Sequence, residues 1–178
     1  MALQTFSYDR EKAVAYANRW AYFRNPEFFD FSELGGDCTN FASQCLYAGS
    51  GIMNYTPIYG WYYISPNDRT PSWTGVQDLY NFLTQNEGPG PFASDVPVFR
   101  VEPGDLIQFR NDKDVFQHTP VVVGVEGPVA NMENILVAAH SYDSNCRPLM
   151  SYSFEEIRFL HIEGVRYETR PPRPEMLF

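Results

Sequence analysis

The chain has 178 residues, of which 44% are hydrophobic and 16% aromatic, and its formal net charge is −9. A chain of this length and apolar content can bury a core without disulfide bonds, which excludes global disorder. The sequence contains no run of basic residues, which excludes nucleic acid and an anionic membrane surface as partners. We expect the acidity to serve solubility.

Three helices are predicted in the N-terminal half. The first spans about residues 8–23, with Asp9 as N-cap and apolar residues at helical spacing. The glycine pair Gly35-Gly36 precedes a second helix, which starts near Asp37 and closes at Gly49. A long aromatic loop over residues 50–75 then leads into a third helix, which ends at about residue 86.

The C-terminal half changes to a strand pattern. Short β-branched segments bounded by turn residues predict strands at 101–110, 116–127, 134–143 and 157–167. Helices followed by consecutive strands are typical of the α+β class. We therefore predict N-terminal helices packed on an antiparallel β-sheet.

Neither export nor membrane insertion is predicted. The N-terminal segment MALQTFSYDREK lacks the basic flank and apolar stretch of a signal peptide, and no apolar run reaches the roughly 20 residues that span a bilayer. As written, the sequence predicts a cytoplasmic protein, with a trimmed leader or another export route left open. Its length predicts one domain over residues 1–178, with a core at about 8–167 and a Pro-rich tail at 168–178. The oligomeric state is not predicted.

The segment GGDCTNFASQCL delivers Cys38 to the start of the second helix, where a cysteine can pack, bind metal or attack a substrate. Unpaired N–H groups and the helix dipole favour a thiolate at this position. The same N–H groups can hold the oxyanion that forms when a carbonyl is attacked. Cys45, two turns further on, is predicted to be a core residue, and Cys146 an uninvolved thiol.

A nucleophilic cysteine also needs a base. His118 stands at the start of one predicted strand and His140 at the end of the next. If the two strands pair antiparallel, both imidazoles lie at the same edge of the sheet, where His140 can orient His118. His161 lies mid-strand and is expected to pack or to face solvent. From the pattern alone, a catalytic pair and ordinary packing are about equally favoured.

A zinc site made of Cys38, His118 and His140 is a weaker alternative. The residue types suit zinc, but catalytic zinc sites usually contain a close ligand pair, and this sequence has none. We therefore predict no metal ion and no organic cofactor.

Several segments together resemble a known family. They are YDREKAVAYANRWA, GGDCTNFASQCL, SWTGVQDLYNFL, VEPGDLIQF, QHTPVVVG and VAAHSYD. They resemble the amidase-like domain family of Gram-positive bacteria, a branch of the papain-like, NlpC-type cysteine peptidases and amidases related to the CHAP domains. The resemblance covers about residues 8–161 and implies a papain-like (NlpC-type) fold.

The resemblance implies that Cys38 is the nucleophile, His118 the general base and acid, and His140 the orienting group. Asp143 is the reserve candidate for the third role. Asp37 and Asn40 match family positions beside the nucleophile. A role as N-cap would suffice for Asp37, and Asn40 would brace the helix against the sheet.

The implied reaction is hydrolysis of an amide bond through a thioester, with a peptide of the peptidoglycan cell wall as substrate. The aromatic loop is expected to form one wall of the cleft, with Trp61 and Trp73 as the most favoured substrate contacts. For any single aromatic residue, however, ordinary packing under the loop is the better expectation. Two alternatives stay open: a non-catalytic cell-wall or peptide-binding module on the same scaffold, and an acyltransferase with an amine acceptor.

Overall fold

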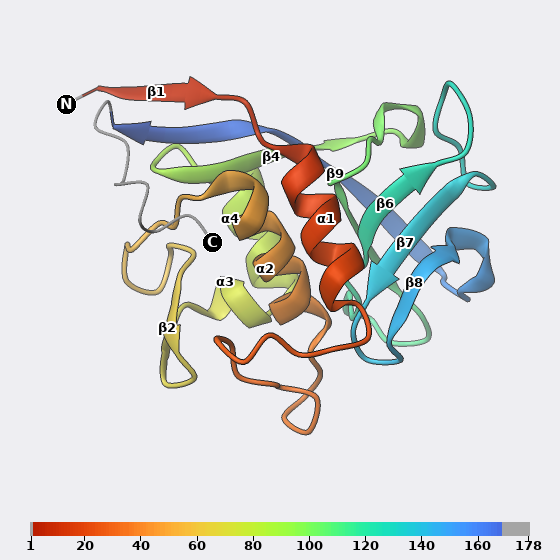
Figure 1. Ribbon diagram of the computed structural model, residues 1–178, viewed down its shortest axis with the longest axis horizontal. Helices are drawn as coiled ribbons and strands as arrows, with labels where there is room; N and C mark the ends of the chain where they lie inside the picture. Colours follow the sequence, from red (N-terminus) through yellow and green to blue (C-terminus); the bar gives the residue numbers. More distant parts are fainter. Residues whose placement is uncertain (1, 169–178) are drawn as a thin grey trace.

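The structure is a computed structural model that describes residues 2–168 (Figure 1). The predicted Pro-rich tail, except for its first residue, lies outside the described residues. The helices are α1 (Arg10–Trp20), α2 (Cys38–Ser50), α3 (Pro71–Thr74) and α4 (Val76–Gln85), with 3-10 turns η1 (Val98–Arg100) and η2 (Leu149–Ser151). The strands are β1 (Leu3–Phe6), β2 (Tyr63–Ser65), β3 (Asp68–Arg69), β4 (Gly90–Val96), β5 (Leu106–Arg110), β6 (Val121–Val125), β7 (Ile135–Ala139), β8 (Ser144–Pro148) and β9 (Glu156–Glu168).

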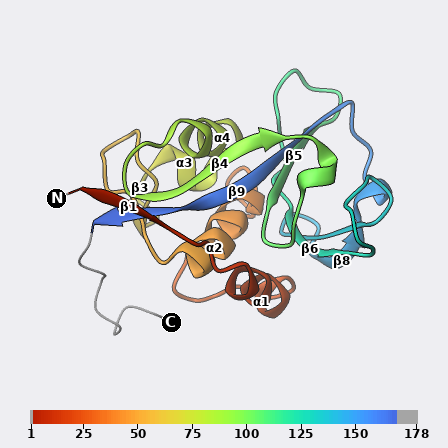
Figure 2. The ribbon, with the colours of Figure 1, turned by 90° about the horizontal axis from the view of Figure 1, so that it is seen from above.

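Within the described residues, seven strands form one antiparallel sheet in the order β1-β9-β5-β6-β7-β8, and β4 pairs with β9 outside this path. Strands β2 and β3 form a separate hairpin. The chain is thus an α+β protein with an antiparallel sheet, as the sequence predicts. Figures 1 and 2 show the helices gathered at the β1–β9–β4 end, while β6, β7 and β8 form the other end.

The sheet separates two hydrophobic clusters, because successive side chains of a strand point to opposite faces. Leu106 and Val121 pack with the helices on one face. Their neighbours Ile107 and Val122 pack on the other face, where the curled strands β5 to β8 enclose the second cluster. The N-terminal helices therefore cover one face only.

The helix ends agree closely with the prediction, with one difference. Asp9 caps α1, since its carboxylate accepts a hydrogen bond from the backbone N–H of Lys12 at 3.0 Å. Helix α2 begins at Cys38 and ends at Ser50, and Gly51, with a φ of 65°, provides the left-handed cap expected at Gly49. Gly49 lies inside the helix instead, where a Cβ atom would come within 2.7 Å of the Asp9 carbonyl oxygen. Glycine at position 49 thus permits close packing of α2 on the start of α1.

The aromatic loop contains more regular structure than predicted. It holds the β2–β3 hairpin and α3, and the predicted third helix is divided into α3 and α4 at Gly75. The backbone N–H of Gly75 donates to the Pro71 carbonyl and closes α3 after one turn. No helix within residues 2–168 has the length and apolar content needed to cross a bilayer.

Candidate active site

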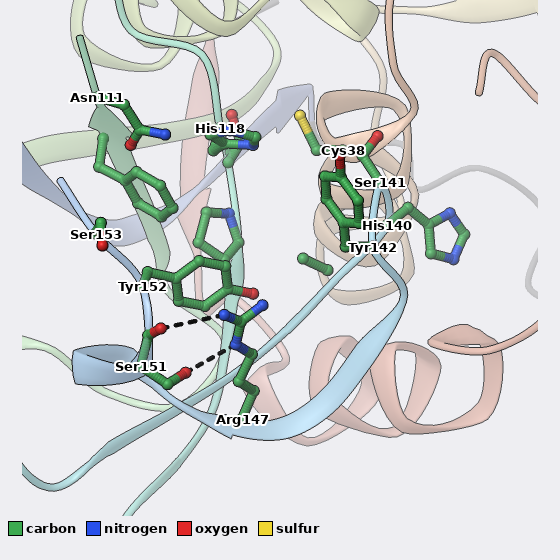
Figure 3. Close-up of a pocket in the computed structure, with 14 residues that line it drawn as sticks. Cys38, Asn111, His118, His140, Ser141, Tyr142, Arg147, Ser151, Tyr152 and Ser153 are labelled. Atoms are coloured by element: carbon green, nitrogen blue, oxygen red, sulfur yellow. Dashed lines mark hydrogen bonds between the residues drawn. The ribbon is translucent and has the colours of Figure 1, made fainter. Parts of the chain in front are cut away.

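A cavity of about 420 Å³ lies at the N-terminus of α2, where it meets β5, β6 and the turn between β7 and β8 (Figure 3). Its volume is within the range of small-molecule sites, which is roughly 300–1,000 Å³. The residues that line it are Cys38, Phe109, Asn111, His118, Thr119, Pro120, Ala139, His140, Ser141, Tyr142, Arg147, Ser151, Tyr152 and Ser153. The structure therefore brings Cys38 and His118, 80 positions apart in the sequence, to one cavity.

Cys38 is the first residue of α2, and its side chain is held against the chain that leads into β6. The thiol donates a hydrogen bond to the backbone carbonyl of Gln117 at 3.6 Å, and Gln117 directly precedes His118. The Thr39 hydroxyl lies 3.8 Å from the sulfur on the other side. The sulfur thus lies next to the backbone that carries the predicted base.

The electrostatics of Cys38 differ from the prediction. Burial raises the pKa of the Cys38 thiol above its ordinary value of 9.0, although hydrogen bonds from Thr119 and Thr39 act in the opposite direction. The residue is only 8% exposed, and loss of hydration disfavours the thiolate more than these hydrogen bonds favour it. The raised pKa therefore favours the thiol at neutral pH.

His118 lies just before β6 and forms an isolated antiparallel bridge with Phe109 of β5. Its ring packs against the Phe109 ring with centroids 5.1 Å apart. Burial, with a smaller effect from the positive charge of Lys113, lowers the pKa of His118 below its ordinary value of 6.5. A neutral imidazole beside a protonated thiol can accept the thiol proton when a substrate is attacked.

His140 is not placed as the predicted orienting group, because its ring has other partners. Nδ1 lies 2.6 Å from the Asp37 carboxylate and Nε2 lies 2.9 Å from the Trp20 carbonyl oxygen. The ring also stacks on Phe41 at 4.0 Å. Figure 3 shows it pointing away from His118.

The register of the sheet explains this placement. Strands β6 and β7 pair as predicted, with Val121 opposite Ala138. Extending this register sets Thr119, not His118, opposite His140. Because adjacent side chains of an extended chain alternate in direction, this register does not direct His140 at His118, although both residues line the cavity.

Asp143, the reserve candidate, is also engaged elsewhere. Its two carboxylate oxygens accept hydrogen bonds from the guanidinium of Arg24 at 2.9 and 3.0 Å. This bidentate pair joins the turn after β7 to the segment after α1. Among the described residues, no hydrogen bond or ion pair joins Asp143 to His118.

Asp37 occupies the N-cap position of α2, but its side chain does not cap the helix. The buried carboxylate accepts hydrogen bonds from the Phe31 backbone N–H and the Asn40 amide, both at 2.8 Å, besides its contact with His140. The Asn40 oxygen accepts from the Trp73 indole N–H at 2.9 Å. Asn40 therefore braces α2 against α3 and the preceding loop rather than against the sheet.

The prediction that Trp61 and Trp73 contact substrate is wrong. Both side chains are completely buried and stack on each other with ring centroids 4.8 Å apart. The Trp61 indole N–H donates to the Ser43 hydroxyl at 3.1 Å. Two large apolar rings with satisfied N–H groups are more stable in the core than at a surface.

Other aromatic residues line the cavity instead: Phe109, Tyr142 and Tyr152. Tyr142 is 88% exposed and lies in the turn between β7 and β8, where Ser141 and Tyr142 both have positive φ angles. The Ser141 hydroxyl accepts a hydrogen bond from the Asp37 backbone N–H at 3.0 Å, which joins this turn to the start of α2.

Sequence reasoning missed Asn111 and Arg147 of the cavity wall. Asn111 directly follows the predicted strand 101–110, which precedes the histidine strand. A polar residue at the end of that strand could have been predicted to lie near His118. Arg147 lies on β8, a strand that the sequence pattern does not predict, so no signal pointed to it.

The remaining cysteines and histidine lie away from the cavity. Cys45 is a core residue, as predicted, and Cys146 is exposed. His161 was predicted either to pack or to face solvent. It packs, with Nδ1 2.8 Å from the buried Asp105 carboxylate. Among residues 2–168, no three His, Cys, Asp or Glu side chains are grouped so that they could hold a metal ion.

A family model described as "Putative amidase domain" matches residues 7–162 of the chain. The chain therefore belongs to this amidase-domain family, in agreement with the resemblance found in the sequence.

A similar protein is YhbB of Bacillus subtilis (strain 168), itself described as uncharacterized, which is 34% identical over 146 residues. The aligned region is 81% of this chain and 45% of YhbB, so the chain spans less than half of that relative. No solved structure gives a significant match.

Proposed function

We propose that the protein is a cysteine-dependent amidase or peptidase that hydrolyses a peptide amide bond through a thioester. The observation that carries this proposal is the shared cavity of Cys38 and His118, in which the sulfur contacts the residue preceding the histidine. A thiol at the start of a helix and a neutral imidazole beside it are the groups that nucleophilic amide hydrolysis needs. The family name, which points to amidase activity, agrees with this chemistry.

In the first half of the reaction, the Cys38 sulfur attacks the amide carbon while the thiol proton passes to His118. The Cys38 backbone N–H, in the first turn of α2, lacks an intrahelical acceptor and can donate to the oxyanion that forms. The carbon–nitrogen bond then breaks, and His118 returns the proton to the leaving amine.

In the second half, water attacks the thioester and passes its proton to His118. The carbon–sulfur bond breaks, the acid leaves, and the proton restores the Cys38 thiol. The raised pKa of Cys38 fits a mechanism in which proton transfer accompanies attack, since little thiolate is present beforehand.

Asn111 is the residue that we propose to position His118. Its Oδ1 atom is buried without a hydrogen-bond partner among the described residues. Figure 3 shows its amide group on the side of His118 opposite to Cys38. An amide oxygen there can accept the imidazole N–H and keep the other ring nitrogen free for the thiol proton. Asn111→Ala should lower kcat with little change in KM, whereas an equal loss in Asn111→Ala and Asn111→Asp would argue against this role.

We further propose a papain-like, NlpC-type arrangement in one domain, with a peptide of the bacterial cell wall as substrate. The order of a cysteine at the start of α2 followed by a histidine just before β6 supports the fold assignment. The cavity lies open at the protein surface beside Tyr142, which suits a peptide rather than a small enclosed metabolite.

The test is to incubate the protein with peptidoglycan stem and cross-bridge peptides and to measure released amines. Cys38→Ala and His118→Ala should each abolish release, and Cys146→Ser should leave it unchanged because Cys146 is exposed and outside the cavity. Mass spectrometry of the parent should detect an acyl group on Cys38. Undiminished hydrolysis by Cys38→Ala would overturn the proposal.

A further inference from the structure

Arg147 gives the cavity a positive charge that the reaction does not require. Among the described residues that line the cavity, there is no Asp, Glu or Lys, and Arg147 carries the only permanent charge. This is unusual in a chain with 22 acidic and 13 basic residues. A permanent cation in a cavity without acidic neighbours attracts anions.

The guanidinium of Arg147 is held in place by uncharged groups. Nε donates to the Ser151 hydroxyl at 2.7 Å, and Nη2 donates to the Ser151 carbonyl at 3.2 Å. The group also lies over the Tyr152 ring, 3.6 Å from its centroid. These contacts fix its position without neutralising its charge.

One edge of the guanidinium is left for a ligand. Within residues 2–168, the hydrogen bonds of Arg147 use Nε and Nη2, Nη1 has no hydrogen-bond acceptor, and no ion pair joins Arg147 to a carboxylate. In Figure 3 this edge faces into the cavity, away from Ser151. Arginine N–H groups with this freedom bind carboxylates strongly and directionally.

We propose that Arg147 binds a carboxylate of the substrate, so that the enzyme selects peptide amides with a free carboxylate close to the bond that is cleaved. This inference rests on the proposed function and adds the substrate class. The carboxylate can be a terminal α-carboxylate or that of an acidic side chain, since the recognising chemistry is the same.

The charge can be tested without any substrate, by alkylating Cys38 with anionic iodoacetate and neutral iodoacetamide in a Cys146→Ser background. At pH 8 His118 is neutral, because its pKa lies below 6.5, so Arg147 is the cation that the reagents meet. The measured quantity is the rate of Cys38 alkylation by iodoacetate divided by the rate with iodoacetamide. Dividing by the same ratio for N-acetylcysteine corrects for the different reactivities of the two reagents. This normalised ratio should fall about fivefold in Arg147→Gln. An unchanged ratio in Arg147→Gln would overturn the proposal.

Two controls separate charge from structure. Arg19→Gln removes an equal charge from α1, outside the cavity, and should leave the ratio unchanged. Arg147→Lys keeps the charge and should retain most of the ratio. Equal losses in Arg147→Lys and Arg147→Gln would assign the effect to packing and overturn the proposal.

The substrate arm compares peptides that carry a terminal α-carboxylate, a side-chain carboxylate, or the matching carboxamides. The parent should cleave at least one of the acidic peptides about tenfold better than its carboxamide, and Arg147→Gln should lose this preference. No preference in the parent would overturn the proposal. The alkylation ratio does not depend on hydrolysis, so a failure of the proposed amidase activity is distinguishable from a failure of carboxylate binding.

Discussion

Asp37 and His140 form a buried pair, with Nδ1 of His140 2.6 Å from Oδ2 of Asp37, one residue before the proposed nucleophile. The pair ties the first turn of α2 to the end of β7. We therefore expect the pair to fix the position of Cys38 relative to the sheet, rather than to move protons.

His140→Ala should lower the free energy of unfolding by about 3 kcal/mol, because it leaves the buried Asp37 carboxylate without its imidazole partner. Urea titration followed by circular dichroism measures this change. Glu155→Ala is the control, since its ion pair with Arg110 is largely exposed, involves no partner of His140 and contributes little to stability. A His140→Ala variant as stable as the parent would contradict the anchoring role.

The pH dependence of catalysis should reflect the lowered pKa of His118. The base must be neutral to accept the thiol proton, and burial lowers the pKa of His118, so that its neutral form extends to lower pH than that of an ordinary histidine. The acidic limb of the kcat/KM profile for a cleaved peptide should therefore lie below pH 6.5. An acidic limb at pH 7 or above would indicate that another group, or a charged His118, controls the reaction.

Trp73 and Tyr142 should respond differently to substitution. Trp73→Phe removes the indole N–H from the buried Asn40 oxygen and should cost about 2 kcal/mol of stability. Tyr142→Ala removes an exposed ring from the cavity rim and should raise KM several-fold while changing stability by less than about 0.5 kcal/mol. Thermal unfolding and steady-state kinetics on both variants distinguish these effects. A KM change in Trp73→Phe but not in Tyr142→Ala would show that Trp73, not Tyr142, contacts the substrate.

The pair of His161 with Asp105 should make stability depend on pH. The hydrogen bond from His161 to the Asp105 carboxylate raises the pKa of His161 above 6.5. A raised folded-state pKa means that the stabilisation is complete below pH 6.5 and is lost as pH rises through the folded-state value. As pH rises from 6.5 to 8.5, the free energy of unfolding should therefore fall less in His161→Gln than in the parent. Parallel urea midpoints for both proteins over this range would contradict the expectation.

Much of the fold was predictable because its signals are local. The Gly35-Gly36 turn and the small residues after it set the start of α2, and with it the position of Cys38. The β-branched segments predict β5, β6, β7 and β9 and their antiparallel pairing. Strand β4 was missed because its start, rich in glycine and proline, looks like a helix end, and β9, its partner, is about 70 residues away.

The parts of the site that were not predictable depend on long-range geometry. A displacement of one residue in the register decides whether His140 faces His118 or Asp37, and sequence periodicity does not define that register. Burial of Trp61 and Trp73 likewise depends on how the aromatic loop folds over α2. The cavity position of Arg147 requires β8, whose sequence SNCRP contains none of the β-branched residues that mark a strand.

Strand β9 has a consequence for the order in which the protein folds. It is the shared neighbour of β1, β4 and β5. Until residues 156–168 have been synthesised, β1 and β4 therefore lack their strand partner, and β5 is paired on one edge only, with β6. A growing chain on the ribosome can form its helices early, but the sheet on which they rest closes only with the last of its strands. Nascent or truncated chains that lack this segment would expose three open strand edges, which are prone to aggregation.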